Sequence, residues 1–176
     1  MKSPSLPPFF MNRLLTYASS MLLSCISGYS FEIEDFMDKI AIIESNNNPN
    51  AIGDSGNAIG AYQMHKDAYL DAVAWCRVKH PLVYELLTFQ KMLKDHKKSC
   101  LDPFTSRLLA TCYVEMIIDR LTDNKQKVTP MTVYMCYNMG YRGARGVNFN
   151  INEIPTHHTR IAMKRAKSIL DTPPAK

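Results

Sequence analysis

Residues 33–51 read IEDFMDKIAIIESNNNPNA, and this stretch decides the fold that the sequence predicts. The run stops at three asparagines before Pro49, where asparagine and the position before proline both disfavour helix. We therefore expect a helix over about residues 31–45, with Ser30 as its N-cap. The apolar side chains of this helix recur at steps of three and four residues, as one face of an amphipathic helix requires, at Ile33, Phe36, Met37, Ile40 and Ile43.

The helical period continues through most of the remaining chain. Residues 49–61, PNAIGDSGNAIGA, interrupt it with three of the seven glycines and predict turns with at most a short hairpin. The expected fold class is mainly α, with one domain over residues 31–171 and a flexible tail over residues 172–176. Further helices, several with a proline at or just before the start, are predicted near residues 65–76, 82–96, 104–121, 130–139 and 157–170.

Residues 1–30 have the pattern of a signal peptide. Arg13 precedes a mainly apolar stretch that ends at Ile26, and small residues follow as in a cleavage site. The stretch is shorter than the ~20 residues that a membrane span needs. We expect export to the periplasm or the extracellular space, with translation starting at Met1 or at Met11.

A second interpretation of the leader is a lipoprotein box. Residues 22–25, Leu-Leu-Ser-Cys, loosely match this box, in which Cys25 would carry the lipid anchor. The leucine before the serine is larger than such boxes usually hold, so the signal peptide remains the main prediction.

The composition is that of an ordinary globular domain with more basic than acidic side chains. The 176 residues are 46% hydrophobic and 21% charged, and the formal net charge of +5 falls to +3 when Lys2 and Arg13 leave with the leader. This excess suits an anionic partner such as a cell wall. Nucleic acid is not an expected partner, because the chain reads as exported and contains no recognised binding motif.

Four cysteines remain after the leader, at positions 76, 100, 112 and 136. An even number in an exported chain allows two disulfides in three pairings, whereas free cysteine also packs well in cores, and both alternatives stay open. The cysteines form no C-x-x-C pair, and no histidines form an i, i+4 pair with a nearby acid. The sequence predicts no metal and no cofactor.

Glu44 is the leading candidate for a catalytic residue. It follows three apolar residues in the last turn of the first predicted helix. The negative end of the helix dipole and apolar neighbours both favour a protonated carboxyl near neutral pH, which is the form that donates a proton to a leaving oxygen. The alternative is an ordinary solvated acid at a helix end.

Two segments resemble the lytic transglycosylase (SLT) domains of the lysozyme superfamily. Glu44-Ser45, Asn48-Pro49-Asn50-Ala51, Gly60 and Gln63 are similar to that family's E-S-x-x-x-P-x-A…G-x-x-Q signature, and Tyr137-Asn138-Met139-Gly140 is similar to its A-Y-N-x-G motif. The motifs occur in the family's order, and the resemblance covers about residues 33–170.

The resemblance implies a lysozyme-like fold and cleavage of the β-1,4 bond between N-acetylmuramic acid (MurNAc) and N-acetylglucosamine (GlcNAc) in peptidoglycan, leaving 1,6-anhydro ends. It makes Glu44 the acid, with glycan strands as partner and a monomer as the expected state. The residues that it implies for substrate binding or positioning are Ser45, Tyr62, Gln63, Tyr137 and Asn138. Tyr62 has two interpretations, a sugar-stacking ring or a core residue.

Asp54 raises a second reaction outcome. Residues 53–57, GDSGN, also resemble the loop of goose-type lysozymes, where an acid at this position would orient a water for hydrolysis. Those lysozymes hold another acid where this chain has His65, which favours the transglycosylase. Asp54 could instead be a turn residue. A third hypothesis is a non-catalytic wall-binding component of a secretion or phage-like apparatus.

Overall fold

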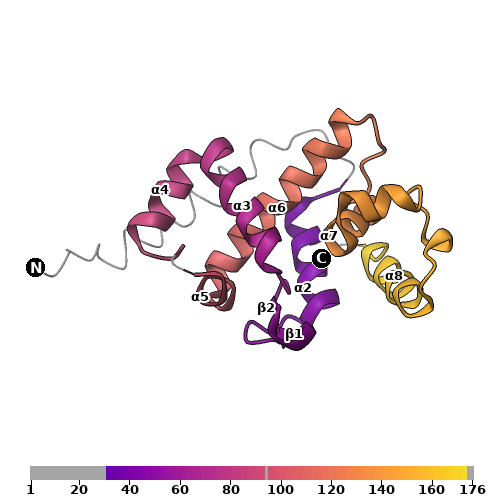
Figure 1. The fold of residues 1–176 in the computed structure, drawn as a ribbon, viewed down its shortest axis with the longest axis horizontal. Helices are drawn as coiled ribbons and strands as arrows, with labels where there is room; N and C mark the ends of the chain where they lie inside the picture. The colour runs from indigo at the N-terminus through magenta and orange to yellow at the C-terminus, as the bar shows by residue number, and fades with distance from the viewer. Residues whose placement is uncertain (1–30, 94, 174–176) are drawn as a thin grey trace, which may run out of the picture.

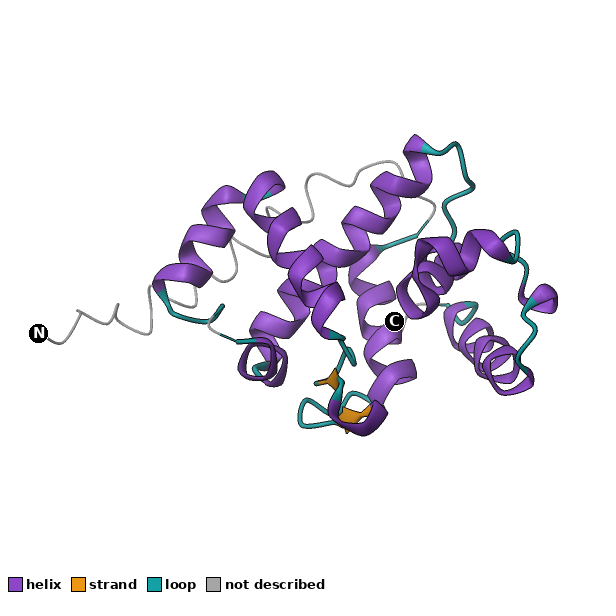
Figure 2. Ribbon diagram, in the orientation of Figure 1, coloured by secondary structure: helices purple, strands orange, loops and turns teal. Residues whose placement is uncertain are grey.

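The computed structural model describes residues 31–93 and 95–173, and this part of the chain is mainly α (Figures 1 and 2). Two short strands, β1 (Ile52–Gly53) and β2 (Ala58–Ile59), form an antiparallel hairpin in which Ile52 pairs with Ile59. The predicted fold class and the short hairpin are therefore confirmed. The helices are α2 (Ile33–Ser45), α3 (Lys66–Lys79), α4 (Pro81–Phe89), α5 (His96–Leu101), α6 (Pro103–Asp123), α7 (Pro130–Gly146) and α8 (His157–Leu170).

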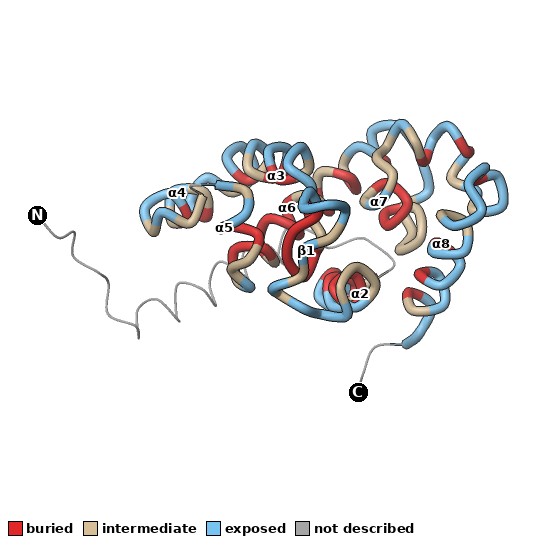
Figure 3. The backbone as a smooth tube through the Cα atoms, turned by 60° about the horizontal axis from the view of Figure 1, so that its bottom comes forward, coloured by how far each residue is buried: buried red, intermediate tan, exposed pale blue. Residues whose placement is uncertain are grey.

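Helix α6 runs through the middle of the molecule and contacts α2, α3, α5 and α7 (Figure 1). It begins at Pro103, whose missing N–H costs nothing at a first helical position, and the Asp102 side chain caps it by accepting the Thr105 amide. Buried residues occur all round the helix, as expected for a central element (Figure 3). This helix therefore supplies the surface on which the other helices pack.

Helix α2 ends where the asparagine cluster begins. Asn46 adopts the left-handed conformation and its amide donates to the Ile42 carbonyl, while the Asn47 amide donates to the Ala41 carbonyl. Asparagine tolerates this conformation better than most residues, so the cluster closes the helix two residues after Glu44. At its other end α2 begins at Ile33, after the N-cap Glu32 and two residues later than predicted.

Two predicted helix boundaries need correction. The helix predicted over residues 82–96 ends at Phe89, because Lys91 turns left-handed and its amide bonds the Thr88 carbonyl, and α5 begins separately at His96. The helix predicted to stop at residue 139 is interrupted there by Gly140 but resumes and continues to Gly146.

The predicted leader, residues 1–30, lies outside the described residues, as does Cys25 within it. Within residues 31–93 and 95–173, no helix has the length and apolar character needed to cross a membrane. In the predicted tail, the backbone carbonyl of Thr172 accepts a hydrogen bond from the side chain of the buried Lys39. Residues 174–176 of this tail are not described. The cysteines at positions 76, 100, 112 and 136 are buried free thiols.

Candidate active site

A cleft of about 430 Å³ opens between the end of α2, the hairpin loop, α6 and α7. Five of the seven residues predicted for the site line this cleft, so segments far apart in the sequence meet there. These residues are Glu44, Asp54, Gln63, Tyr137 and Asn138.

Glu44 is a partly buried acid with one direct tyrosine partner. The hydroxyl of Tyr134 donates a hydrogen bond to Oε1 of Glu44 at 2.9 Å. Burial raises the pKa of Glu44 above its usual range, and hydrogen bonding from Tyr134 and Asn138 opposes this shift only in part. The carboxyl is thus biased toward the protonated form while it still faces the cleft.

Helix α7 carries the tyrosine partner of Glu44 together with two residues that line the cleft. Tyr134, Tyr137 and Asn138 stand three and four residues apart, which places them on one face of the helix. Gly140 follows with φ 71° and ψ 158°, a conformation that is open essentially to glycine alone, and it ends the first segment of α7 just beyond this face.

Tyr137 joins α7 to the hairpin region. Its hydroxyl donates to the backbone carbonyl of Tyr62 at 2.7 Å, and its ring meets that of Tyr113 on α6 edge-on at 5.5 Å between centroids. The wall of the cleft is therefore fixed from two sides.

Gln63 bonds the backbone of one glycine and lies close to another. It has a positive φ of 44°, and its Nε2 donates to the carbonyl of Gly60 at 2.9 Å. A Cβ at Gly53 would lie 2.3 Å from Oε1 of Gln63, and a Cβ at Gly60 would lie 1.9 Å from the Cys100 carbonyl oxygen. Gly60, with φ 78° and a backbone oxygen in the way, therefore requires glycine, whereas a side chain at Gly53 would displace the end of the Gln63 side chain.

Asp54 lies in the cleft but remains solvated. Its side chain is 63% exposed, and Oδ2 is 3.5 Å from Nε2 of His65, whose side chain is 53% exposed. An exposed pair of this kind contributes about 0–1 kcal/mol to stability. Asp54 is consequently free to contact water or a ligand.

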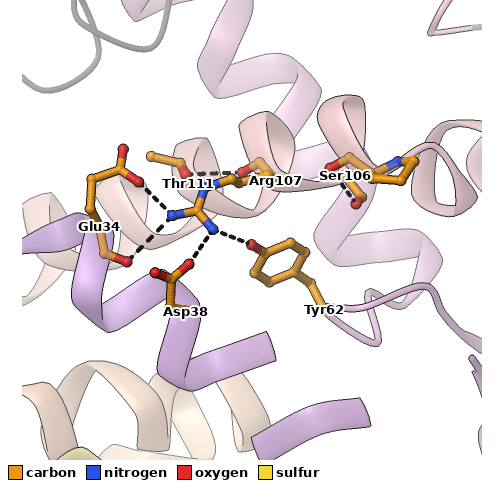
Figure 4. Close-up of polar contacts among 7 residues, drawn as sticks. Glu34, Asp38, Tyr62, Ser106, Arg107 and Thr111 are labelled. Carbon is orange, nitrogen blue, oxygen red and sulfur yellow. Dashed lines mark hydrogen bonds and ion pairs between the residues drawn. The ribbon is translucent and has the colours of Figure 1, made fainter. Parts of the chain in front are cut away.

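The side chains of Ser45 and Tyr62 point elsewhere. The hydroxyl of Ser45 donates to the Ala61 carbonyl at 2.8 Å and accepts the Asn48 amide, so it ties the helix end to the loop. Tyr62 is 4% exposed, and its hydroxyl accepts from Arg107 at 3.1 Å in an ion-pair cluster with Asp38 (Figure 4). Of the two interpretations of Tyr62, the geometry fits the core residue.

The sequence analysis missed two tyrosines of the site, one that bonds Glu44 and one that lines the cleft. Tyr134 stands four residues before Asn138 in one helix, so helical spacing alone could have pointed to it. Tyr113 comes from α6, and no local pattern links it to the predicted motifs. Among the described residues, the group that could hold a metal ion lies outside the cleft, and it consists of His80, Cys112 and Glu115.

Comparisons of this chain with family models, with curated proteins and with solved structures give no match.

Proposed function

We propose that this chain is a lytic transglycosylase with a lysozyme-like fold, which cleaves peptidoglycan with Glu44 as its single acid and base. The observation that carries the proposal is the Glu44 carboxyl, which faces a cleft while burial raises its pKa. A general acid needs both properties, because it must hold a proton near neutral pH and must reach the leaving oxygen. The resemblance of the motifs around Glu44 and Asn138 supplies the substrate class.

In the proposed reaction, Glu44 first acts as an acid. It donates its proton to the glycosidic oxygen as the bond from that oxygen to C1 of MurNAc breaks, so GlcNAc leaves with a free hydroxyl. The Glu44 carboxylate then takes the proton of the C6 hydroxyl of the same MurNAc. The C6 oxygen bonds to C1, a 1,6-anhydro ring closes, the acid is regenerated and no water is consumed.

Three neighbours of Glu44 or of the cleft have positioning roles in this proposal. Tyr134 holds one oxygen of Glu44 and so leaves the other to face the glycosidic bond. Asn138 is exposed in the cleft and offers an amide to the N-acetyl and peptide groups of the substrate. Gln63 offers a second amide from the turn that follows β2. These neutral donors suit a glycan, whose recognition groups are hydroxyls and amides.

The proposal includes the compartment and the partner. A glycan-cleaving enzyme of this kind would work outside the cytoplasm on peptidoglycan strands, as the signal-peptide prediction for residues 1–30 implies, and it could serve a secretion or phage-like apparatus. The net positive charge supports weak, salt-sensitive attraction to anionic wall polymers.

The mass of the products tests the reaction. Purified peptidoglycan incubated with the chain should release muropeptides whose MurNAc ends are lighter by one water than hydrolysed ends. The matched control is Glu44→Gln, which keeps the side-chain shape without a transferable proton. Release of anhydro ends by the variant at the wild-type rate would refute the role of Glu44, and the absence of any cleavage by the wild-type chain would refute the enzyme.

Asp54 favours one alternative reaction, hydrolysis as in goose-type lysozymes. Its solvated carboxylate lines the same cleft as Glu44. Inverting glycosidases use such a second carboxylate to activate a water. That reaction would leave reducing ends, and Asp54→Asn would abolish them. The same mass measurement therefore decides between the two reactions.

A further inference from the structure

A second cluster of reactive side chains lies where α3 meets α6, outside the cleft. A ring nitrogen of His80, the sulfur of Cys112 and a carboxylate oxygen of Glu115 all lie within 4.8 Å of one another. Cys112 and Glu115 stand three residues apart and thus share one face of α6, while His80 caps the end of α3. The contact between these two helices therefore assembles the cluster.

Glu115 shows an unsatisfied polar group at the centre of this cluster. Its side chain is 8% exposed, and Oε2 lies 2.6 Å from Nε2 of His80 and accepts the indole N–H of Trp75 at 3.4 Å. The other oxygen, Oε1, is buried without a hydrogen-bond partner among the described residues. Native structures rarely leave a buried carboxylate oxygen unpaired, and where one occurs, a bound ion is a standard explanation.

We propose that His80, Cys112 and Glu115 bind a zinc ion. Imidazole, thiolate and carboxylate are the three ligand types that zinc takes in proteins. One thiolate and one carboxylate also balance the two charges of the ion, so the buried site is neutral when filled, and the Cys112 proton passes to solvent on binding.

The spacing of the three ligand atoms, all within 4.8 Å of one another, must change to accept the ion. Zinc bonds of about 2.0–2.3 Å in a tetrahedron separate ligand atoms by roughly 3.3–3.8 Å. The contact between His80 and Glu115 must widen to this range, and the sulfur of Cys112 must lie within it. Oε1 of Glu115 then binds the ion while Oε2 keeps the hydrogen bond from Trp75, an arrangement that holds a ligand in place.

Cys76 is the nearest additional thiol. Its thiol lies next to that of Cys112. In the filled site the Cys76 thiol would donate to the sulfur of Cys112. The same proximity defines the competing structure, a disulfide between Cys76 and Cys112.

Trp75 provides a direct readout, because it is the one tryptophan in the sequence and its indole bonds Glu115. The reduced full chain, freed of metal with a chelator that is then removed, is titrated with zinc chloride. We expect saturation at one ion per chain with a matching change in Trp75 fluorescence. Titration with cobalt chloride should add the ultraviolet absorption of a cobalt–thiolate bond.

Variants of the proposed ligands distinguish a specific zinc site from adventitious zinc binding. Cys112→Ser and Glu115→Gln should each weaken zinc binding by at least 10-fold, whereas the control Cys136→Ser, a buried thiol on α7, should bind as the wild type does. Circular dichroism checks that each variant is folded. No saturable binding, equal binding by Cys112→Ser and Cys136→Ser, or a Cys76–Cys112 disulfide in the freshly purified chain would overturn the proposal. None of these outcomes depends on the peptidoglycan reaction.

Discussion

Glu44 and Glu115 are two shielded glutamates that differ in their partners. Glu44 faces a cleft and meets neutral groups, the hydroxyl of Tyr134 and the amide of Asn138. Glu115 lies between two packed helices and meets an imidazole and a thiol. Neutral donors leave the carboxyl of Glu44 free to exchange its proton. The basic ring and the thiol beside Glu115 are instead the further ligands of the proposed zinc site. The contrast teaches that the neighbours of a shielded carboxyl decide its chemistry.

Glu44 and Glu115 also differ in where they stand within their helices. Glu44 stands one residue before the end of α2, where the negative end of the helix dipole adds to burial in favouring the protonated acid. Glu115 stands in the middle of the long helix α6, far from either terminus. Its side-chain partners, Trp75 and His80, come from α3 and from the residue that follows it.

The largest expected effect comes from exchanging each glutamate for glutamine. Glu44→Gln should lower the rate of peptidoglycan cleavage by about 10²–10⁴, which is the usual contribution of a general acid. Glu115→Gln should leave the rate unchanged, because it changes no residue of the cleft. Loss of turbidity of a peptidoglycan suspension, measured at a temperature where both variants are folded, gives the two rates. Equal loss of activity in the two variants would remove the distinction between the two glutamates.

The second effect concerns stability and the pair of His80 and Glu115. His80→Ala should destabilise the chain by about 3–5 kcal/mol, because it leaves a buried carboxylate without its main partner. Adding Glu115→Gln to this variant should recover part of the loss. Urea unfolding in the presence of a chelator measures both, so that metal binding makes no contribution. A double variant less stable than His80→Ala would show that the pair is not coupled in this way.

The third effect tests the hydroxyl that holds Glu44. Tyr134→Phe removes a hydrogen bond that lowers the pKa of Glu44, so the high-pH limb of the activity profile should move to higher pH. Loss of this hydrogen bond should also cost about 0.5–1.5 kcal/mol of stability. The matched control is Tyr141→Phe in the same helix, whose buried hydroxyl has no partner among the described residues, so its removal should not lower stability. Identical pH profiles for wild type and Tyr134→Phe would contradict the assigned contact.

Local sequence patterns predicted most of the region around Glu44. The apolar period of α2 and the asparagines after it predicted a helix ending beside Glu44, because both signals act within a few residues. The same reasoning overextended the helix after residue 82, since Lys91 carries no clear breaking signal and yet turns left-handed. The glycine at position 140 was recognised within a motif, but its interruption of a continuing helix was not.

The cluster around Glu115 could not be predicted from the spacing of residues within one helix. His80 belongs to the end of α3, whereas Cys112 and Glu115 belong to α6, and only the packing of the two helices brings them together. Spacing rules compare residues within one element, so they favoured an absence of metal ligands here. Tyr113 was missed at the cleft for the same reason, because it too approaches the site from another helix.

The smallest expected effect is the influence of Glu44 on stability, and it carries a definite sign. The folded pKa of Glu44 is raised above its unfolded value near 4.5, so between these two values the folded chain binds more protons and loses stability as pH rises. Above the folded pKa the full cost of burying the ionised group remains.

Glu44→Gln removes this cost while its amide oxygen can still accept from Tyr134. The variant should therefore melt at a slightly higher temperature than the wild type at pH 8 and show no such advantage below pH 4. Thermal unfolding followed by circular dichroism resolves the difference, since 1 kcal/mol shifts the midpoint by about 2–4 °C for a chain of this size. An advantage that persists unchanged at acid pH would mean that the charge of Glu44 is not its source.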